Sequence, residues 1–73
     1  MNTIEFELRG GADDYIQLIQ LLKAVNCVET GADAQALVME GLVKRNGEVE
    51  MRKRAKCVSG DVVELDDIRI VVK

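Results

Sequence analysis

The chain has 73 residues and a formal net charge of −3, with 48% hydrophobic and 32% charged residues. A chain this short buries only about 60% of the surface that it exposes when unfolded. We therefore expect residues 1–73 to form a single small domain with one core and one binding face. The sequence contains no histidine, which excludes imidazole bases, Ser-His and Cys-His pairs, and histidine metal ligands.

No apolar run reaches the roughly 20 residues of a membrane span, and the first residues lack the basic and apolar regions of a secretory signal. We therefore expect a cytoplasmic protein with no membrane partner. Cys27 and Cys57 are the two cysteines, so a structural zinc site, which needs four nitrogen or sulfur ligands, is excluded. We expect both thiols to be reduced and mostly buried, because one disulfide is too sparse for a secreted scaffold.

The first segment predicts a half-buried strand. Ile4, Phe6 and Leu8 alternate with polar residues over positions 3–8, and this period of two is typical of a strand with one buried side. The Gly-Gly pair at positions 10–11 ends the pattern. We expect Phe6 to lie in the core.

The next segment predicts a helix, because five apolar residues recur at the spacing of a helical face directed at a core. Asp14 and Gln17 have the spacing of a capping box, which favours a start near Asp14. The alternation of residues 15–18 leaves open a start near Leu18, and in either case the helix is expected to end by Asn26. The apolar face consists of Tyr15, Leu18, Ile19, Leu22 and Val25.

A second, short helix is predicted between Thr30 and Gly41. Thr30 is a favoured N-cap residue, and Asp33 stands where its carboxylate can reach back to the cap. Gly41 is typical of the position just after a helix C-terminus. The inner face consists of Ala34, Leu37 and Val38.

After Gly41 the pattern changes to strands. Asn46 and Gly47 form the strongest short hairpin signal, and they lie between two short segments at 42–45 and 48–50. A two-residue hairpin of this kind pairs the residues that flank the turn. Each face of the hairpin then carries a mixture of apolar and charged side chains. The hairpin is therefore expected to be short and exposed.

Residues 51–56 have no clean period and are expected to form a basic loop, with a turn at 59–61. Two closing strands are predicted over 62–65 and 68–72. The sequence leaves open whether the first strand pairs with the last. One change from helical to strand periodicity, after a single first strand, predicts an α+β fold with two short helices packed on a small, mostly antiparallel sheet.

Basic residues gather in one part of the chain. Residues 1–40 contain two basic and seven acidic side chains, whereas residues 41–60 contain six basic and two acidic ones. Like charges kept this close repel each other, and a polyanionic partner would relieve the repulsion. A solvated basic turn is the alternative interpretation of the charge alone. The six cations are Lys44, Arg45, Arg52, Lys53, Arg54 and Lys56.

The triplet at 52–54 is expected to present the highest positive potential. Glu48 or Glu50 lies near Lys44 and Arg45 in the sequence and partly offsets their charge. The triplet, reinforced by Lys56, has Glu50 two residues before it and no acidic residue after it until Asp61. The triplet is therefore predicted to carry most of the affinity for a polyanion.

Residues 16–65 resemble a known module. The stretch is similar to the RNA-binding domain of the ribosomal-protein-S-four type, also called the αL motif, in the small stand-alone bacterial version of the YbcJ-like proteins. The ordered set of short motifs carries the resemblance, above all the Arg-Lys-Arg-x-Lys run between the hairpin and a Gly-Asp pair. The motifs are Ile16-x-Leu18-x-x-Leu21-Leu22-Lys23, Thr30-Gly31-Ala32-x-Ala34, Glu40-Gly41-x-Val43, Asn46-Gly47-x-Val49-Glu50-x-Arg52-Lys53-Arg54-x-Lys56 and Gly60-Asp61-x-Val63.

The resemblance implies two packed helices against a small sheet, with an RNA surface made by the second helix's N-terminus, the loop and the hairpin. At the helix, the backbone N–H groups near Thr30 and Gly31 would face a phosphate. The chain departs from the family at 33–35, where no cation stands, and at Arg45, where an apolar residue is usual. These departures imply a weaker contact at the helix and a stronger one at the hairpin.

Three function classes follow. The first is a non-catalytic module that binds structured RNA, ribosomal or transfer, through the six cations with Thr30 and Gly31; it needs no cofactor, metal ion or small-molecule substrate. Base stacking is not expected, because Tyr15 and Phe6 are both placed near the core. The second is a protein-interaction module with an acidic helical face or an exposed sheet edge. The third, an enzyme using Cys57 beside cations, lacks a base partner, so no catalytic residue is predicted. The oligomeric state is left open, with a monomer as the expectation.

Overall fold

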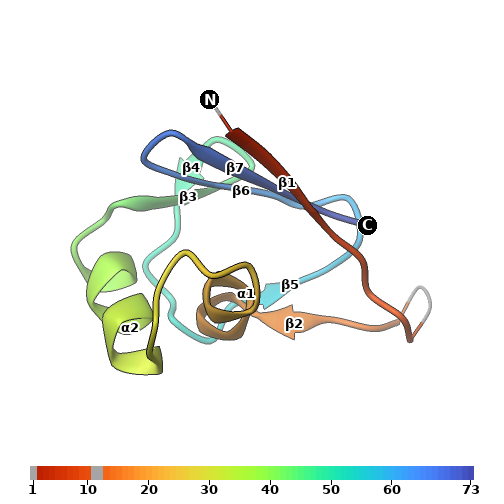
Figure 1. The fold of residues 1–73 in the computed structure, drawn as a ribbon, viewed down its shortest axis with the longest axis horizontal. Coiled ribbons are helices and arrows are strands. Elements are labelled where there is room, and N and C mark those ends of the chain that lie inside the picture. The colour runs from red at the N-terminus through yellow and green to blue at the C-terminus, as the bar shows by residue number, and fades with distance from the viewer. Residues whose placement is uncertain (1, 11–12) are drawn as a thin grey trace.

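The computed structural model describes residues 2–10 and 13–73. Nine elements follow one another along these described residues, and they form a five-stranded sheet, a two-stranded sheet and two helices (Figure 1). They are β1 (Asn2–Phe6), β2 (Ile16–Gln17), α1 (Leu18–Ala24), α2 (Gly31–Met39), β3 (Val43–Arg45), β4 (Glu48–Val49), β5 (Lys56–Cys57), β6 (Val62–Leu65) and β7 (Ile68–Val72).

The larger sheet has the strand order β1-β7-β6-β3-β4. β7 pairs antiparallel with β6, β6 with β3, and β3 with β4, while β1 pairs parallel with β7. The first strand therefore does pair with the last, in the register Ile4 to Ile70 and Phe6 to Val72. The predicted α+β class with a mostly antiparallel sheet is confirmed.

Both helices lie on the same side of this sheet (Figure 1). Their apolar faces meet the inward residues of the strands, which alternate with outward residues along each strand. No helix in the described ranges 2–10 and 13–73 is long and apolar enough to span a membrane. The buried core comprises Leu18, Leu21, Leu22, Ala34, Val38, Val43, Ala55, Cys57, Val63, Leu65, Ile70 and Val72.

The strand β1 ends at Phe6, two residues before the end of the predicted strand over 3–8. β7 ends at Val72, which is the partner of Phe6, so no regular partner remains for residues beyond Phe6. Leu8 makes one further bond, from its amide to the Lys73 carbonyl at 2.8 Å. Phe6 is half-buried and packs against the core instead of lying within it.

The helix α1 begins at Leu18, so the later of the two predicted starts is confirmed. The residues before it form β2, which pairs antiparallel with β5. Tyr15 therefore precedes the helix, and the residue is 45% exposed. The prediction that Tyr15 belongs to the helical face and lies near the core is wrong, because strand pairing of residues 16–17 takes precedence over the capping box at Asp14.

The predicted boundaries of α2 are confirmed. The Thr30 hydroxyl accepts a hydrogen bond from the Asp33 amide at 3.1 Å, as an N-cap residue does. At the other end, Gly41 has φ +75°, the left-handed conformation that suits the residue after a helix. The Gly41 amide donates to the Val38 carbonyl and the Leu42 amide to the Leu37 carbonyl.

The hairpin between β3 and β4 turns at Asn46 and Gly47, as predicted. Their φ angles are 54° and 87°, and positive values at both central residues define a type I′ turn. Lys44 pairs with Val49 and Arg45 with Glu48. The Asn46 side chain also accepts from the Val62 amide and donates to Asp61, which attaches the turn to β6.

Replacing Gly47 by valine should lower the free energy of unfolding by about 1–3 kcal/mol, because a β-branched residue is strained at positive φ. An added Cβ would meet no atom of the described chain within 4 Å, so the cost comes from the backbone alone. Urea denaturation measures it. Gly47→Asn is the matched control and should lose less, since asparagine tolerates this region. Equal stability of Gly47→Val and the parent would contradict the turn type.

Candidate nucleic-acid interface

The basic loop is held against the start of α1. The first amides of a helix have no partner within the helix, and here Leu18 donates to the Ala55 carbonyl at 2.9 Å and Ile19 to the Lys53 carbonyl at 3.2 Å. Ala55 is buried in the core. The loop is therefore anchored through its backbone, while the side chains on either side of Ala55 remain free to face solvent.

Glu50 organises the cations around it. Its side chain is only 11% exposed, and it accepts hydrogen bonds from the Arg52 amide at 3.2 Å and from Nε and Nη2 of Arg52 at 3.2 and 3.3 Å. Nε of Arg45 lies 3.6 Å from the same carboxylate. The hydrogen bond from Arg52 lowers the pKa of Glu50, and the same bond raises the pKa of Arg52.

Arg45 connects the hairpin to β5. Its side chain is 24% exposed, and Nη1 donates to the Lys56 carbonyl at 2.9 Å. Because Lys56 is the first residue of β5, the predicted loop over 51–56 ends one residue earlier than expected. An apolar residue at position 45 could not make this bond, so the arginine at this position has a structural role as well as a charge.

The structure brings five of the predicted residues together. One concavity is lined by Arg45, Arg52, Arg54, Ala55 and Lys56. A neighbouring one is lined by Arg52, Lys53 and Arg54 together with Gln35, Met39 and Met51. We call the five cations the basic surface: Arg45, Arg52, Lys53, Arg54 and Lys56.

The other three predicted residues lie outside the basic surface. Successive residues of a strand point to opposite sides, so Lys44 lies on the side of the sheet away from Arg45, beside its cross-strand partner Glu64. Thr30 and Gly31 mark the start of α2, where the Thr30 hydroxyl already accepts from Asp33. Neither of the two concavities of the basic surface is lined by these three residues.

The expected distribution of charge around Glu50 is only half right. Glu50 does offset Arg45, but it also pairs with Arg52 at the start of the triplet, so the positive charge of the triplet is partly offset as well. The side chain of Arg52 is nevertheless 74% exposed. Arg54 and Lys56 are exposed and Lys53 is half-buried, so these three contribute charge outside the Glu50 pairs.

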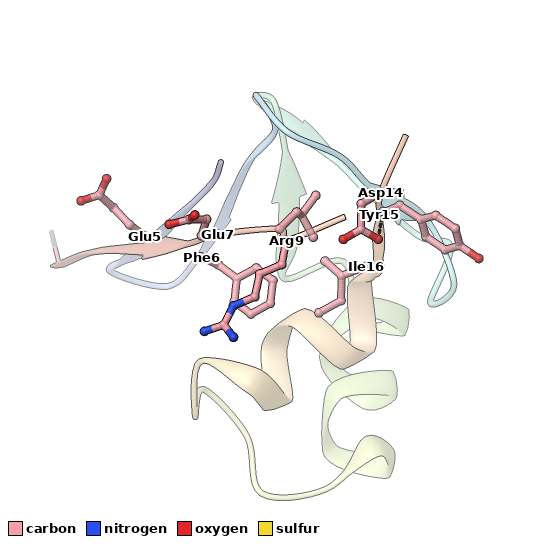
Figure 2. A pocket seen from close by; sticks show the side chains of 8 residues that line it. Glu5, Phe6, Glu7, Arg9, Asp14, Tyr15 and Ile16 are labelled. Atoms are coloured by element: carbon pink, nitrogen blue, oxygen red, sulfur yellow. Dashed lines mark hydrogen bonds between the residues drawn. The ribbon is translucent and has the colours of Figure 1, made fainter. Parts of the chain in front are cut away.

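Tyr15 is a neighbour of the basic surface that sequence reasoning placed wrongly. Nζ of Lys56 lies 4.9 Å from the centroid of its ring. Tyr15 lines a cavity together with Phe6 and Ile16, and Figure 2 shows its ring extending away from those two side chains. The alternation of residues 15–18 was the signal that could have separated Tyr15 from the helix.

The thiol of Cys57 does not have the surroundings of a reactive group. It is completely buried, and burial raises its pKa despite the opposing effect of Arg45. A nucleophilic thiolate needs an accessible site with a lowered pKa, so the enzyme interpretation loses its candidate residue. Both cysteines are free thiols, and Cys27 is half-buried.

Comparisons with known proteins agree with this arrangement. The S4 domain family matches residues 7–73. YbcJ of Escherichia coli strain K12, named as a candidate RNA-binding protein, is 43% identical over 53 residues, which are 73% of this chain and 76% of the relative. YbcJ of Shigella flexneri matches to the same extent.

A solved structure shares both the fold and part of the sequence of this chain. The solution structure of Escherichia coli YbcJ, described as revealing an αL motif involved in RNA binding, has a TM-score of 0.67 and 36% identity. The match covers 97% of this chain and 90% of that one. Together with the family match over residues 7–73, this likeness places the chain in the S4 domain family, as a relative of YbcJ with the αL fold.

Proposed function

We propose that this chain is a non-catalytic RNA-binding module that recognises structured RNA, ribosomal or transfer, through its basic surface. The observation that carries the proposal is that five cations, from β3, the loop and β5, line two neighbouring concavities. They gather there although the net charge of the protein is −3. Membership in the S4 domain family and the RNA-binding descriptions of YbcJ support the same class.

The side chains of the basic surface suit phosphate groups. Arginine offers a planar fork of N–H donors that matches two phosphate oxygens, and Arg54 and the outer edge of Arg52 are exposed. The loop backbone that carries these side chains is anchored at the Lys53 and Ala55 carbonyls, which accept hydrogen bonds from the start of α1. Phosphate contacts of this type recognise the path of the RNA backbone, which favours a folded RNA over a particular sequence.

The proposal takes residues 1–73 as a single domain acting as a cytoplasmic monomer. Lys44, Thr30 and Gly31 stay predicted RNA contacts outside the basic surface, and the proposal does not depend on them. The backbone amides at the start of α2 could serve a phosphate only as a supplement to the cations.

A protein-interaction module is the second candidate, and one observation favours it. Four large apolar side chains are exposed near the end of α2 and the hairpin: Met39, Leu42, Val49 and Met51. An apolar interface would keep its affinity as salt is raised, whereas binding to phosphates weakens steeply. The salt dependence of binding therefore separates the two candidates.

Co-sedimentation from cell lysate tests the class of RNA. A tagged chain should sediment with ribosomal particles or recover transfer RNA, and ribonuclease treatment should release it. A variant with Lys53 and Arg54 replaced by alanine should fail to sediment. Sedimentation that resists ribonuclease and salt would contradict the proposal and favour the protein-interaction module.

A further inference from the structure

Tyr15 presents an exposed aromatic ring beside the basic surface. The residue is 45% exposed, and Figure 2 shows its ring extending away from Phe6 and Ile16. An aromatic residue whose role is to fill the core would bury its ring among apolar neighbours instead. The ring therefore needs another explanation.

The position of the ring is set by the strands that carry the cations. Tyr15 comes immediately before β2, where Gln17 pairs with Lys56 of β5. Nζ of Lys56 lies over one face of the ring, 4.9 Å from the centroid, and the Lys56 carbonyl accepts the hydrogen bond from Arg45. The ring is thus connected to the basic surface through one strand pair and one side-chain bond.

We propose that Tyr15 is a base-stacking residue: one unpaired RNA base stacks on the ring face opposite to Lys56, while the adjoining phosphate contacts the Lys56 ammonium group. The inference rests on the RNA-binding function proposed above and narrows its ligand to folded RNA with an unpaired nucleotide beside a stem. Aromatic side chains stack on any base, because every base has a π-face. Unpaired bases in loops and bulges are the ones that a protein can reach in this way.

Two hairpin RNAs and two variants test the inference. The probes are a hairpin with one unpaired bulge nucleotide in its stem and the same hairpin with a fully paired stem. Tyr15→Leu removes the π-face and keeps apolar bulk, and it should weaken binding of the bulged hairpin by about 5- to 100-fold. It should change binding of the paired hairpin by less than about twofold, since no base is available there to stack.

Tyr15→Phe is the matched control. It keeps the aromatic face, so it should bind the bulged hairpin within about twofold of the parent. Thermal unfolding followed by circular dichroism checks that both variants are folded. A general loss of structure would weaken both hairpins alike, whereas a lost stacking site weakens only the bulged one.

The fluorescence of the ring gives a second readout. The chain has one tyrosine and no tryptophan, so its intrinsic emission comes from Tyr15. Stacking should quench this emission on binding the bulged hairpin more than on binding the paired hairpin at equal RNA absorbance. Inorganic polyphosphate has no bases and should produce no stacking quench.

The outcomes distinguish the two proposals. Selective weakening of the bulged hairpin by Tyr15→Leu, with quenching in the parent, is the result that we expect. Equal binding of both hairpins by the parent and by Tyr15→Leu would overturn the stacking role and leave RNA binding intact. If the parent binds neither hairpin at low salt, both the stacking role and the proposed function are wrong.

Discussion

Replacing Arg52, Lys53 and Arg54 together by alanine should weaken binding to a structured RNA about 100-fold at about 0.1 M salt. Each phosphate that a cation neutralises releases condensed counterions, which is worth roughly tenfold in affinity at that salt concentration. Lys53 and Arg54 contribute one contact each, and Arg52 contributes less because Glu50 already holds part of its guanidinium. A gel-shift or filter-binding titration measures the loss.

A matched control removes the same charge elsewhere. Lys23 lies on α1, Arg69 on β7 and Lys73 just after it, and changing these three to alanine should alter affinity by less than about threefold. The double variant, with Lys53 and Arg54 changed to alanine, keeps the pairing of Arg52 with Glu50. It should therefore show most of the loss of RNA affinity seen in the triple variant, without loosening the loop. Equal weakening by the two triple variants would mean that net charge, and not the basic surface, governs binding.

Replacing Glu50 by alanine should lower the free energy of unfolding by about 2–4 kcal/mol near neutral pH. The change removes the bonds from Arg52 to a buried carboxylate and leaves Arg45, itself largely covered, without its charge partner. Charge-assisted hydrogen bonds of this kind contribute about 1.5–3 kcal/mol, and an unpaired covered charge adds to the loss. Glu50→Gln keeps an acceptor for Arg52 and should lose less.

The stabilising effect of Glu50 should also depend on pH. The hydrogen bond from Arg52 lowers the pKa of Glu50 below its ordinary value of 4.5. A carboxylate whose pKa is lowered in the folded state stabilises the fold above its unfolded pKa, and this contribution is lost as the pH falls through the lower, folded value. The parent and Glu50→Gln should therefore differ in stability near neutral pH and become more alike below pH 4.5. A difference that stays constant over this range would contradict the pairing.

The elements that the sequence predicted well are those fixed by local interactions. The cap at Thr30, the end of α2 at Gly41 and the turn at Asn46 and Gly47 each depend on residues within five positions of one another. Such signals are visible in the sequence because the side chain that makes the bond is close to the backbone group that needs it.

The features that the sequence left open or missed depend on distant partners. The parallel pairing of β1 with β7 joins the two ends of the chain. The exposure of Tyr15 follows from the pairing of β2 with β5, about forty residues apart in the sequence. For the site, residue type and spacing predicted the gathering of five of the six cations, but not that Lys44 lies on the other side of the sheet or that Glu50 folds back onto Arg52. Both depend on the pairing of the strands and the course of the loop.

The salt dependence of RNA affinity tests most directly whether the basic surface binds phosphates. A plot of log affinity against log salt concentration should be linear for the parent, with a slope of roughly −0.7 to −0.9 for each phosphate contacted. The variant with Arg52, Lys53 and Arg54 changed to alanine should flatten that slope by about 2 units, because Lys53 and Arg54 contribute one contact each and Arg52 contributes less. A folded triple variant that binds the same RNA with an unchanged slope would contradict the account, because the loop would then be only a solvated, solubilising turn.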